Sequence, residues 1–144
     1  MKNAVVTLLL FSISMAALAG QSEPPALVPH EIHSITITLD GDLVQLEPMS
    51  VTTDGRTLIR ELAALVSRAV PGEDHKCRDI GEIRFKLRSG ETVRIGLLPA
   101  HQEGLYDLRF YLSEGYSVRQ IDRESLLSLL ERTGIPARSP EFPG

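Results

Sequence analysis

The amino-acid sequence predicts an α+β domain in which an antiparallel sheet is covered by two helices on one face. Two segments repeat apolar residues at helical spacing, and six short segments alternate apolar with polar residues. Short turns join most of the strand segments, which favours antiparallel pairing between neighbours. The predicted order is ββ-α-ββββ-α, a meander of four strands between the two helices.

The first two predicted elements are strands. Apolar and polar residues alternate over residues 35–40, and Asp40-Gly41-Asp42 is a typical turn sequence. A short second strand over residues 43–46 should pair back on the first before Pro48, which cannot donate a backbone hydrogen bond.

The first helix is predicted over residues 58–69, where apolar side chains recur at helical spacing and charged side chains face away from them. Asp54 or Thr57 is the expected N-cap. The helix should end at Val70-Pro71-Gly72, because neither proline nor glycine continues a helix well.

Four further strands are predicted from alternating apolar and polar residues. They cover residues 83–87, 93–97, 106–112 and 116–121. In the final helix, Asp122 should cap the start and Gly134 should end it in the left-handed conformation. The apolar faces of these elements predict a shared core that includes Leu62, Leu65, Phe85, Ile95, Leu108, Phe110, Leu126 and Leu130.

The N-terminal 19 residues are typical of a secretory signal peptide. Lys2 supplies the positive start, an apolar run follows, and Ala17-Leu18-Ala19 places small residues at the recognition positions. The run is too short to stay behind as a stable membrane anchor. We therefore expect an exported protein, periplasmic or secreted, with a flexible leader over residues 20–30, a single domain over 31–135 and a flexible proline-containing tail over 136–144.

Charge and cysteine content limit the function further. A net charge of −4 at pH 7 argues against nucleic-acid binding, which usually needs a basic surface. Cys77 is the single cysteine, so the chain cannot form an internal disulfide. Its thiol is therefore buried, reactive, bound to metal, or paired with another molecule, for example in a disulfide-linked homodimer.

Three residues form a candidate metal site. His75 and Cys77 share one side of an extended chain, and His101 would complete a ligand set suited to copper or zinc. Lys76 and Arg78 would stabilise a thiolate, which also suits a redox role. A small hydrolase using Cys77 with His101 as base is a further alternative, although no nucleophile-elbow or phosphate-loop motif accompanies the pair.

A basic sheet face is the second candidate site. Alternation places basic side chains on the side of the meander away from the core; they are Arg84, Lys86, Arg88, Arg94 and Arg109. Arginine suits carboxylates and phosphates, so the expected partner is a protein or an anionic envelope polymer. The same pattern also fits a solvated face that Glu82 and Glu91 neutralise.

The sequence favours an exported, non-enzymatic binding module of the cell envelope that needs no cofactor. This interpretation rests on the predicted signal peptide, the small domain and the lack of a catalytic motif. The alternatives are a copper- or zinc-binding or redox-related protein and a small hydrolase.

We predict cleavage between Ala19 and Gly20, because the small-residue pattern ends there. Mass spectrometry of the protein from the extracytoplasmic fraction should show Gly20 as the first residue. An intact Met1 in that fraction would contradict the prediction.

Overall fold

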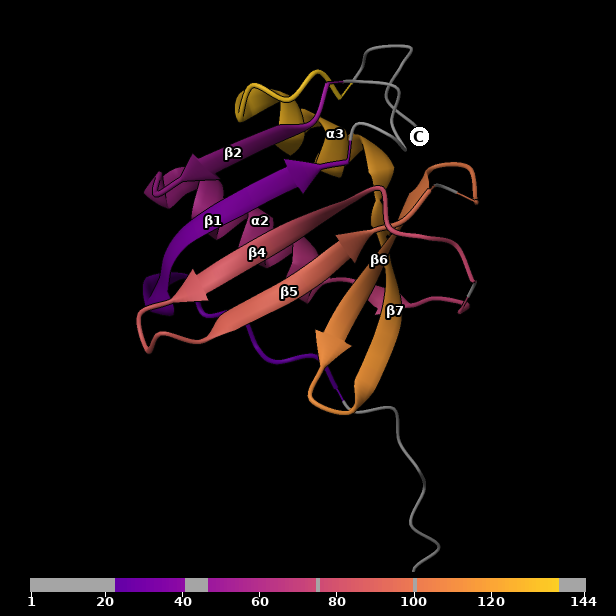
Figure 1. Ribbon diagram of the computed structural model, residues 1–144, viewed down its shortest axis with the longest axis horizontal. Helices are drawn as coiled ribbons and strands as arrows, with labels where there is room; N and C mark the ends of the chain where they lie inside the picture. Colours follow the sequence, from indigo (N-terminus) through magenta and orange to yellow (C-terminus); the bar gives the residue numbers. More distant parts are fainter. Residues whose placement is uncertain (1–22, 41–46, 75, 100, 138–144) are drawn as a thin grey trace, which may run out of the picture.

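A seven-stranded antiparallel sheet backed by two helices forms the protein, as a computed structural model shows (Figure 1). The structure describes residues 23–40, 47–74, 76–99 and 101–137. The strand order across the sheet is β2-β1-β4-β5-β6-β7-β3. The strands are β1 (Ile32–Leu39), β2 (Met49–Thr53), β3 (Val70–Pro71), β4 (Gly81–Leu87), β5 (Thr92–Leu97), β6 (Leu105–Leu112) and β7 (Gly115–Asp122).

Two helices and a short 3-10 turn complete the fold. They are η1 (Pro29–Glu31), α2 (Arg56–Ser67) and α3 (Arg123–Arg132). Both helices lie behind the sheet in Figure 1, so one sheet face is covered and the other, here called the outer face, meets solvent. The predicted α+β fold with two helices on one face is therefore confirmed.

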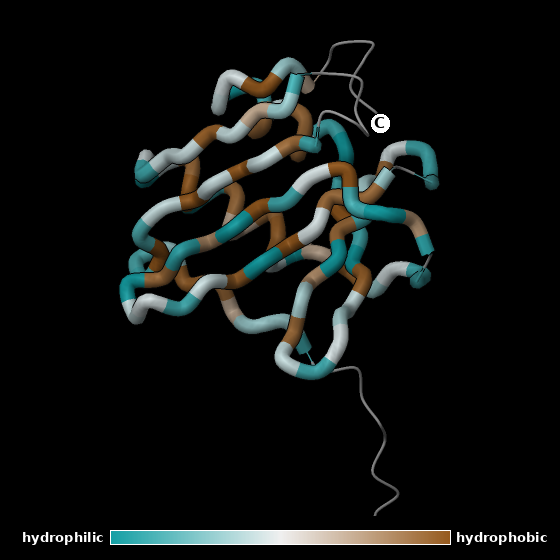
Figure 2. The backbone as a smooth tube through the Cα atoms, in the orientation of Figure 1, coloured by the Kyte–Doolittle hydropathy of each residue, from teal (hydrophilic) through white to brown (hydrophobic). Residues whose placement is uncertain are grey.

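The strand register explains how a single core forms. Ile35 lies opposite Phe85, and Ile37 lies opposite Ile83, so apolar side chains meet across β1 and β4 on the helix side. The alternate residues Thr36 and Thr38 face outward. Brown apolar positions alternate with paler ones along these strands in Figure 2. All eight residues of the predicted core belong to one buried cluster.

The helix signals differ in how well they predict the helix ends. Asp122 caps α3 as predicted, because its Oδ2 accepts a hydrogen bond from the Ser125 backbone N–H at 2.8 Å. Gly134 adopts the predicted left-handed conformation with φ of 93°. Helix α2 instead begins after Gly55 with no side-chain cap, so the predicted caps, Asp54 and Thr57, are wrong.

Two short strands of the sheet were not predicted from the sequence. Besides β4, β1 pairs with β2, which begins after Pro48. The segment predicted for that strand, residues 43–46, lies outside the described residues, as does the predicted signal peptide. Val70 and Pro71 form the short edge strand β3 beside β7, where a proline is tolerated because one side of the strand is unpaired.

Both ends of the domain pack more closely than their composition predicts. Leu27, in the segment expected to form a flexible leader, is 6% exposed and belongs to the core. Ala137, in the expected tail, is 3% exposed and belongs to the same cluster. Proline content alone therefore did not reveal that single apolar side chains anchor these segments.

We predict that Leu126→Ala destabilises the protein by about 2–5 kcal/mol, because Leu126 is fully buried in the core beneath the sheet. Chemical denaturation followed by circular dichroism measures the change. Arg60→Ala, on the exposed side of α2, is the control and should change stability by less than about 0.5 kcal/mol. A similarly small loss for Leu126→Ala would contradict the assigned packing.

Candidate functional site

A short connection before β4 crosses the outer face of the sheet and organises the polar groups there. We call residues 76–79 of this connection the strap. Arg109 on β6 donates from Nη1 to Asp79 Oδ1 at 2.6 Å and from Nη2 to the Cys77 carbonyl at 3.1 Å. Tyr111, two residues further along β6, donates its hydroxyl to Asp79 Oδ2. Two side chains of one strand therefore hold the strap against the sheet.

Gly96 makes room for this contact. A Cβ atom at Gly96 would lie 2.1 Å from Asp79 Oδ2, which no side chain tolerates, so only glycine allows the carboxylate to sit over β5. The ion pair is partly withdrawn from water, with the side chains of Arg109 and Asp79 11% and 19% exposed. Burial and the hydrogen bond to Asp79 both raise the pKa of Tyr111, so this hydroxyl stays protonated and keeps donating.

A second carboxylate, Glu82, orders two arginines on the same face. Arg84 and Arg94 lie directly opposite each other on β4 and β5. Arg94 donates to Glu82 Oε2 from Nε at 3.1 Å and from Nη2 at 2.6 Å, and Arg84 also donates to Glu82. Partial burial opposes ionisation of Glu82, but the hydrogen bonds from Arg94 and Arg84 hold its pKa below the usual value.

Two tyrosine rings continue this row across the sheet. The Arg94 guanidinium lies 4.9 Å from the ring centre of Tyr111, and the Arg109 guanidinium lies 4.9 Å from that of Tyr116. Tyr111 and Tyr116 face each other across β6 and β7. We call this row, formed by Arg84, Arg94, Tyr111, Tyr116 and Arg109, the arginine–tyrosine ladder.

An open hollow of about 410 Å³ lies beside the ladder, and we call it the outer hollow. Among the residues that the structure describes, six charged side chains line it, three basic and three acidic: Arg78, Arg84, Arg109, Asp40, Asp79 and Glu82. This part of its wall therefore presents both signs of charge in equal number.

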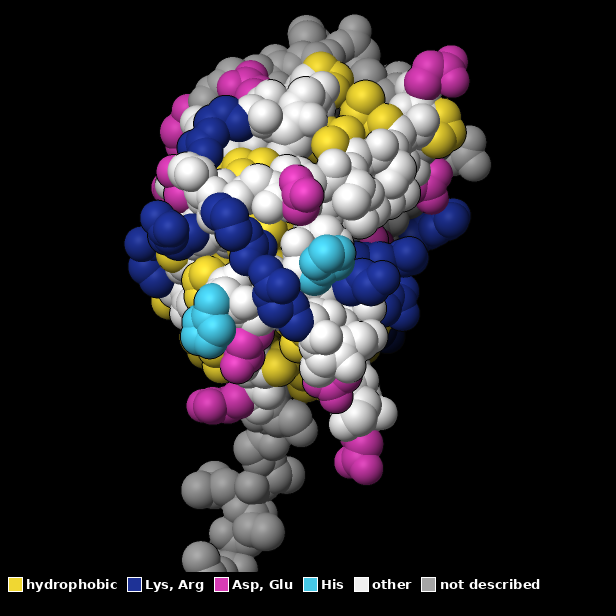
Figure 3. Space-filling model, turned by 90° about the vertical axis from the view of Figure 1, so that its left-hand side faces the viewer, with side chains coloured by type: hydrophobic (Ala, Val, Ile, Leu, Met, Phe, Trp, Pro, Cys, Tyr) yellow, Lys and Arg dark blue, Asp and Glu magenta, His cyan; other side chains and the backbone are white. Residues whose placement is uncertain are grey.

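The predicted basic surface does not form one continuous patch. Arg84, Lys86 and Arg94 project from the outer face, and Arg109 lies on the same face beneath the strap. Arg88 lies beyond the end of β4, where its Nε donates to the His30 carbonyl at 3.0 Å. In Figure 3 the outer face forms the right-hand edge, where Lys and Arg side chains gather.

The structure brings together two of the three predicted metal-site residues. The Cys77 Sγ lies 3.1 Å from His101 Nε2, although the two residues are far apart in sequence. Cys77 is half-buried and His101 is exposed. His75 lies outside the described residues. Within the described ranges, no three His, Cys, Asp or Glu side chains are grouped so as to hold a metal ion.

A polar hollow of about 620 Å³ adjoins this thiol–imidazole pair, because His101 is one of its lining residues. Three carboxylates and two amides also line it, and none of the described residues in its wall is lysine or arginine. The polar lining comprises His101, Gln102, Glu73, Asp74, Asp107 and Gln120. Asp74 Oδ2 accepts the Tyr116 hydroxyl at 2.9 Å, which links this hollow to the ladder.

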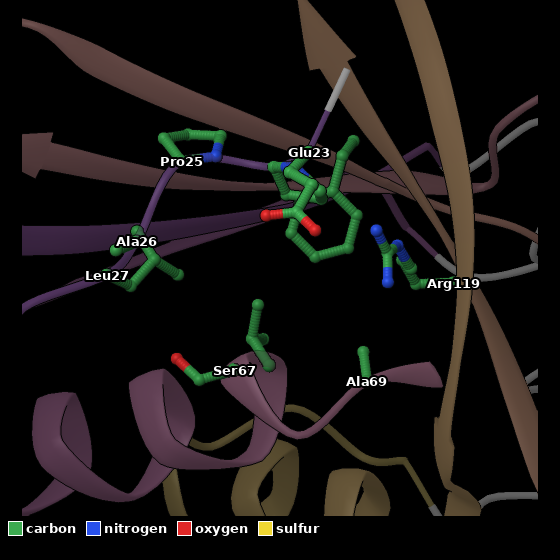
Figure 4. A pocket seen from close by; sticks show the side chains of 10 residues that line it. Glu23, Pro25, Ala26, Leu27, Ser67, Ala69 and Arg119 are labelled. Atoms are coloured by element: carbon green, nitrogen blue, oxygen red, sulfur yellow. The ribbon is translucent and has the colours of Figure 1, made fainter. Parts of the chain in front are cut away.

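A third, smaller hollow of about 250 Å³ lies between the N-terminal segment and α2. Figure 4 shows Glu23 and Arg119 facing each other across it, with Leu27, Ser67 and Ala69 along its sides. Part of its wall is the N-terminal segment packed on the helix side, away from the strap. We therefore place the candidate site on the outer face.

Sequence reasoning missed the residues that organise the site, namely Asp79, Gly96, Tyr111 and Tyr116. One signal was present: a glycine inside an alternating strand often marks a close approach by another group. The sequence could not show that Asp79 is that group, because the contact joins residues 17 positions apart through the fold.

No family model, curated protein or solved structure matches this chain. Within the part of the chain that the structure describes, no helix is both long and apolar enough to cross a membrane.

We predict strong energetic coupling between Asp79 and Gly96. Gly96→Ala should cost about 1–3 kcal/mol, because the new methyl group displaces the Asp79 carboxylate. Asp79→Ala should also cost about 1–3 kcal/mol, because it removes the carboxylate that pairs with the partly buried Arg109 guanidinium. In the Asp79→Ala background, Gly96→Ala should cost less than about 0.5 kcal/mol, since nothing remains to displace.

Chemical denaturation of the four proteins measures this coupling. Thr92→Ala, an exposed change on the same strand, is the matched control and should be additive with Asp79→Ala. Equal costs of Gly96→Ala in both backgrounds would contradict the close contact.

Proposed function

We propose that the protein is an exported, non-enzymatic binding module whose outer sheet face engages a protein partner at Arg84 and Arg94. The observation that carries the proposal is the cross-strand pair of arginines fixed by Glu82. Their side chains are 55% and 51% exposed, so guanidinium N–H groups remain available to a partner's carboxylates.

The fixed positions of these arginine side chains favour binding. Glu82 holds both guanidinium groups, and the Tyr111 ring supports Arg94 from the side. Side chains that are already ordered lose less conformational entropy when a partner docks. Arginine and tyrosine are also the residue types that most often supply large shares of binding energy in protein interfaces.

The charge pattern favours a protein over a polyanion. The outer hollow carries three acidic groups beside its three basic groups, and the acidic groups would repel a uniformly negative polymer. A folded protein can place carboxylates on Arg84 and Arg94 while meeting Asp40 with a basic or neutral group. The partner we propose is thus a protein surface of mixed charge, with its acidic part over the two arginines.

Binding, and not catalysis, is the role that these contacts support. Each arginine of the ladder is paired with a neighbouring carboxylate: Arg84 and Arg94 with Glu82, and Arg109 with Asp79. A surface built this way is complementary to a second surface of fixed charge pattern.

The proposal is tested by site-specific photocrosslinking in the native host. A photoreactive residue replacing Lys86, beside the arginines, should give a discrete crosslinked species. The same group replacing Arg60, on the exposed side of α2, should not. Arg84→Glu combined with Arg94→Glu should reduce the Lys86 crosslink at least about tenfold, because each reversed charge would repel a carboxylate of the partner. A tenfold loss of affinity corresponds to about 1.4 kcal/mol.

Arg60→Glu is the matched charge-reversal control and should leave the Lys86 crosslink unchanged. Thermal unfolding of each variant checks that the fold is retained. Equal crosslinking from positions 60 and 86, or no effect of the double reversal, would contradict the proposed face. Salt-sensitive binding to an acidic polysaccharide such as alginate, with no protein crosslink, would favour the polymer alternative instead.

A further inference from the structure

We infer that Cys77 and His101 form a thiol–disulfide exchange site that takes a small disulfide bearing amino groups. The inference rests on the 3.1 Å contact between the thiol and the imidazole and on the polar hollow beside them. It does not depend on the proposed binding face, since none of these residues is Arg84, Arg94 or Lys86.

The fold fixes the position of the thiol. The Cys77 carbonyl is held by Arg109, and the next-but-one residue, Asp79, is held by Arg109 and Tyr111. The strap therefore presents Cys77 toward the loop that carries His101. The His101 Nε2 lies where it can accept the thiol proton or donate to a thiolate.

The exchange step balances with one small disulfide as co-reactant. The proton on Cys77 Sγ passes to His101 Nε2, and the sulfur attacks one sulfur of the disulfide. A new S–S bond forms to Cys77 while the old S–S bond breaks. The released thiolate takes the proton from His101 and leaves as a thiol. Because the chain has one cysteine, the product is a mixed disulfide with the small molecule.

The hollow indicates which disulfide is suitable. Its volume of about 620 Å³ lies within the usual range for small-molecule sites. Glu73, Asp74 and Asp107 line it, and no lysine or arginine does among the residues placed by the structure, so a molecule with ammonium groups gains attraction there while a dicarboxylate is repelled. His101 lines the hollow, and its Nε2 lies 3.1 Å from the Cys77 sulfur, so the hollow adjoins the pair through the imidazole.

The geometry fits proton transfer better than metal coordination. A tetrahedral zinc ion with ordinary bond lengths would hold sulfur and nitrogen about 3.5 Å apart. The observed distance is 3.1 Å, which suits a direct hydrogen bond. Among the residues that the structure places, no third ligand joins the pair.

The test measures the reaction of the folded, reduced protein with cystamine at pH 7, using mass spectrometry to follow the mixed disulfide. The folded protein should react at least about tenfold faster than the same protein in urea, because only the fold places His101 beside the thiol. His101→Gln should lose that advantage, and Cys77→Ser should not react. His33→Gln, at an exposed histidine on β1, is the matched control and should keep it.

Charge preference tests the ligand class. Each rate is divided by that of the urea-unfolded chain, which contains the same flanking Lys76 and Arg78. On this scale cystamine should exceed 3,3′-dithiodipropionate, its negatively charged counterpart, by about tenfold or more, which corresponds to about 1.4 kcal/mol.

Four results would overturn the inference. They are equal rates in the folded and unfolded protein, an unchanged rate in His101→Gln, equal normalised rates for the two disulfides, and a disulfide-linked homodimer as the main product. Tight binding of one equivalent of Cu(I) or Zn²⁺ that blocks the thiol, lost in both Cys77→Ser and His101→Gln, would likewise replace the exchange site with the metal alternative.

Discussion

The carboxylate of Asp79, seated over Gly96, is the contact on which the outer face depends. It receives Arg109 and Tyr111 from β6, and it lies over β5, so one side chain joins the strap to two strands of the meander. Glycine at position 96 permits the approach, and the partial burial of the ion pair strengthens it. The positions of the Cys77 backbone and of the outer hollow both follow from this contact.

The placement of the core explains why the polar network lies where it does. Both helices cover the same sheet face, so the central strands β1, β4 and β5 send their large apolar side chains toward the helices and their charged side chains to the outer face. Crowding like charges on one exposed face would be unfavourable. Glu82 lies between Arg84 and Arg94, and Asp79 faces Arg109, so each of these three arginines has an acidic neighbour.

Periodicity in the sequence was enough to predict the meander, both helices and the core, because these features repeat over many residues. Signals carried by single residues predicted the structure less consistently. Asp122 and Gly134 act as predicted, whereas α2 begins without the expected cap. Pairing with β1 determines that β2 lies after Pro48, and a local sequence pattern does not show which segments pair. The candidate site was harder still, since Asp79, Gly96 and the tyrosines meet only through the fold.

The two proposed sites both depend on Arg109 for their structure, but different side chains would bind or react at each. Arg109 contacts Asp79, the Cys77 carbonyl and the Tyr116 ring, so a change at Arg109 would disturb both sites at once. Arg84 and Arg94 depend on Glu82 and have no contact with the thiol–imidazole pair in the network above. Changes at those two arginines therefore probe the binding face, and changes at His101 probe the exchange site. Loss of one activity without the other would show that this small sheet carries two separate functions on one face.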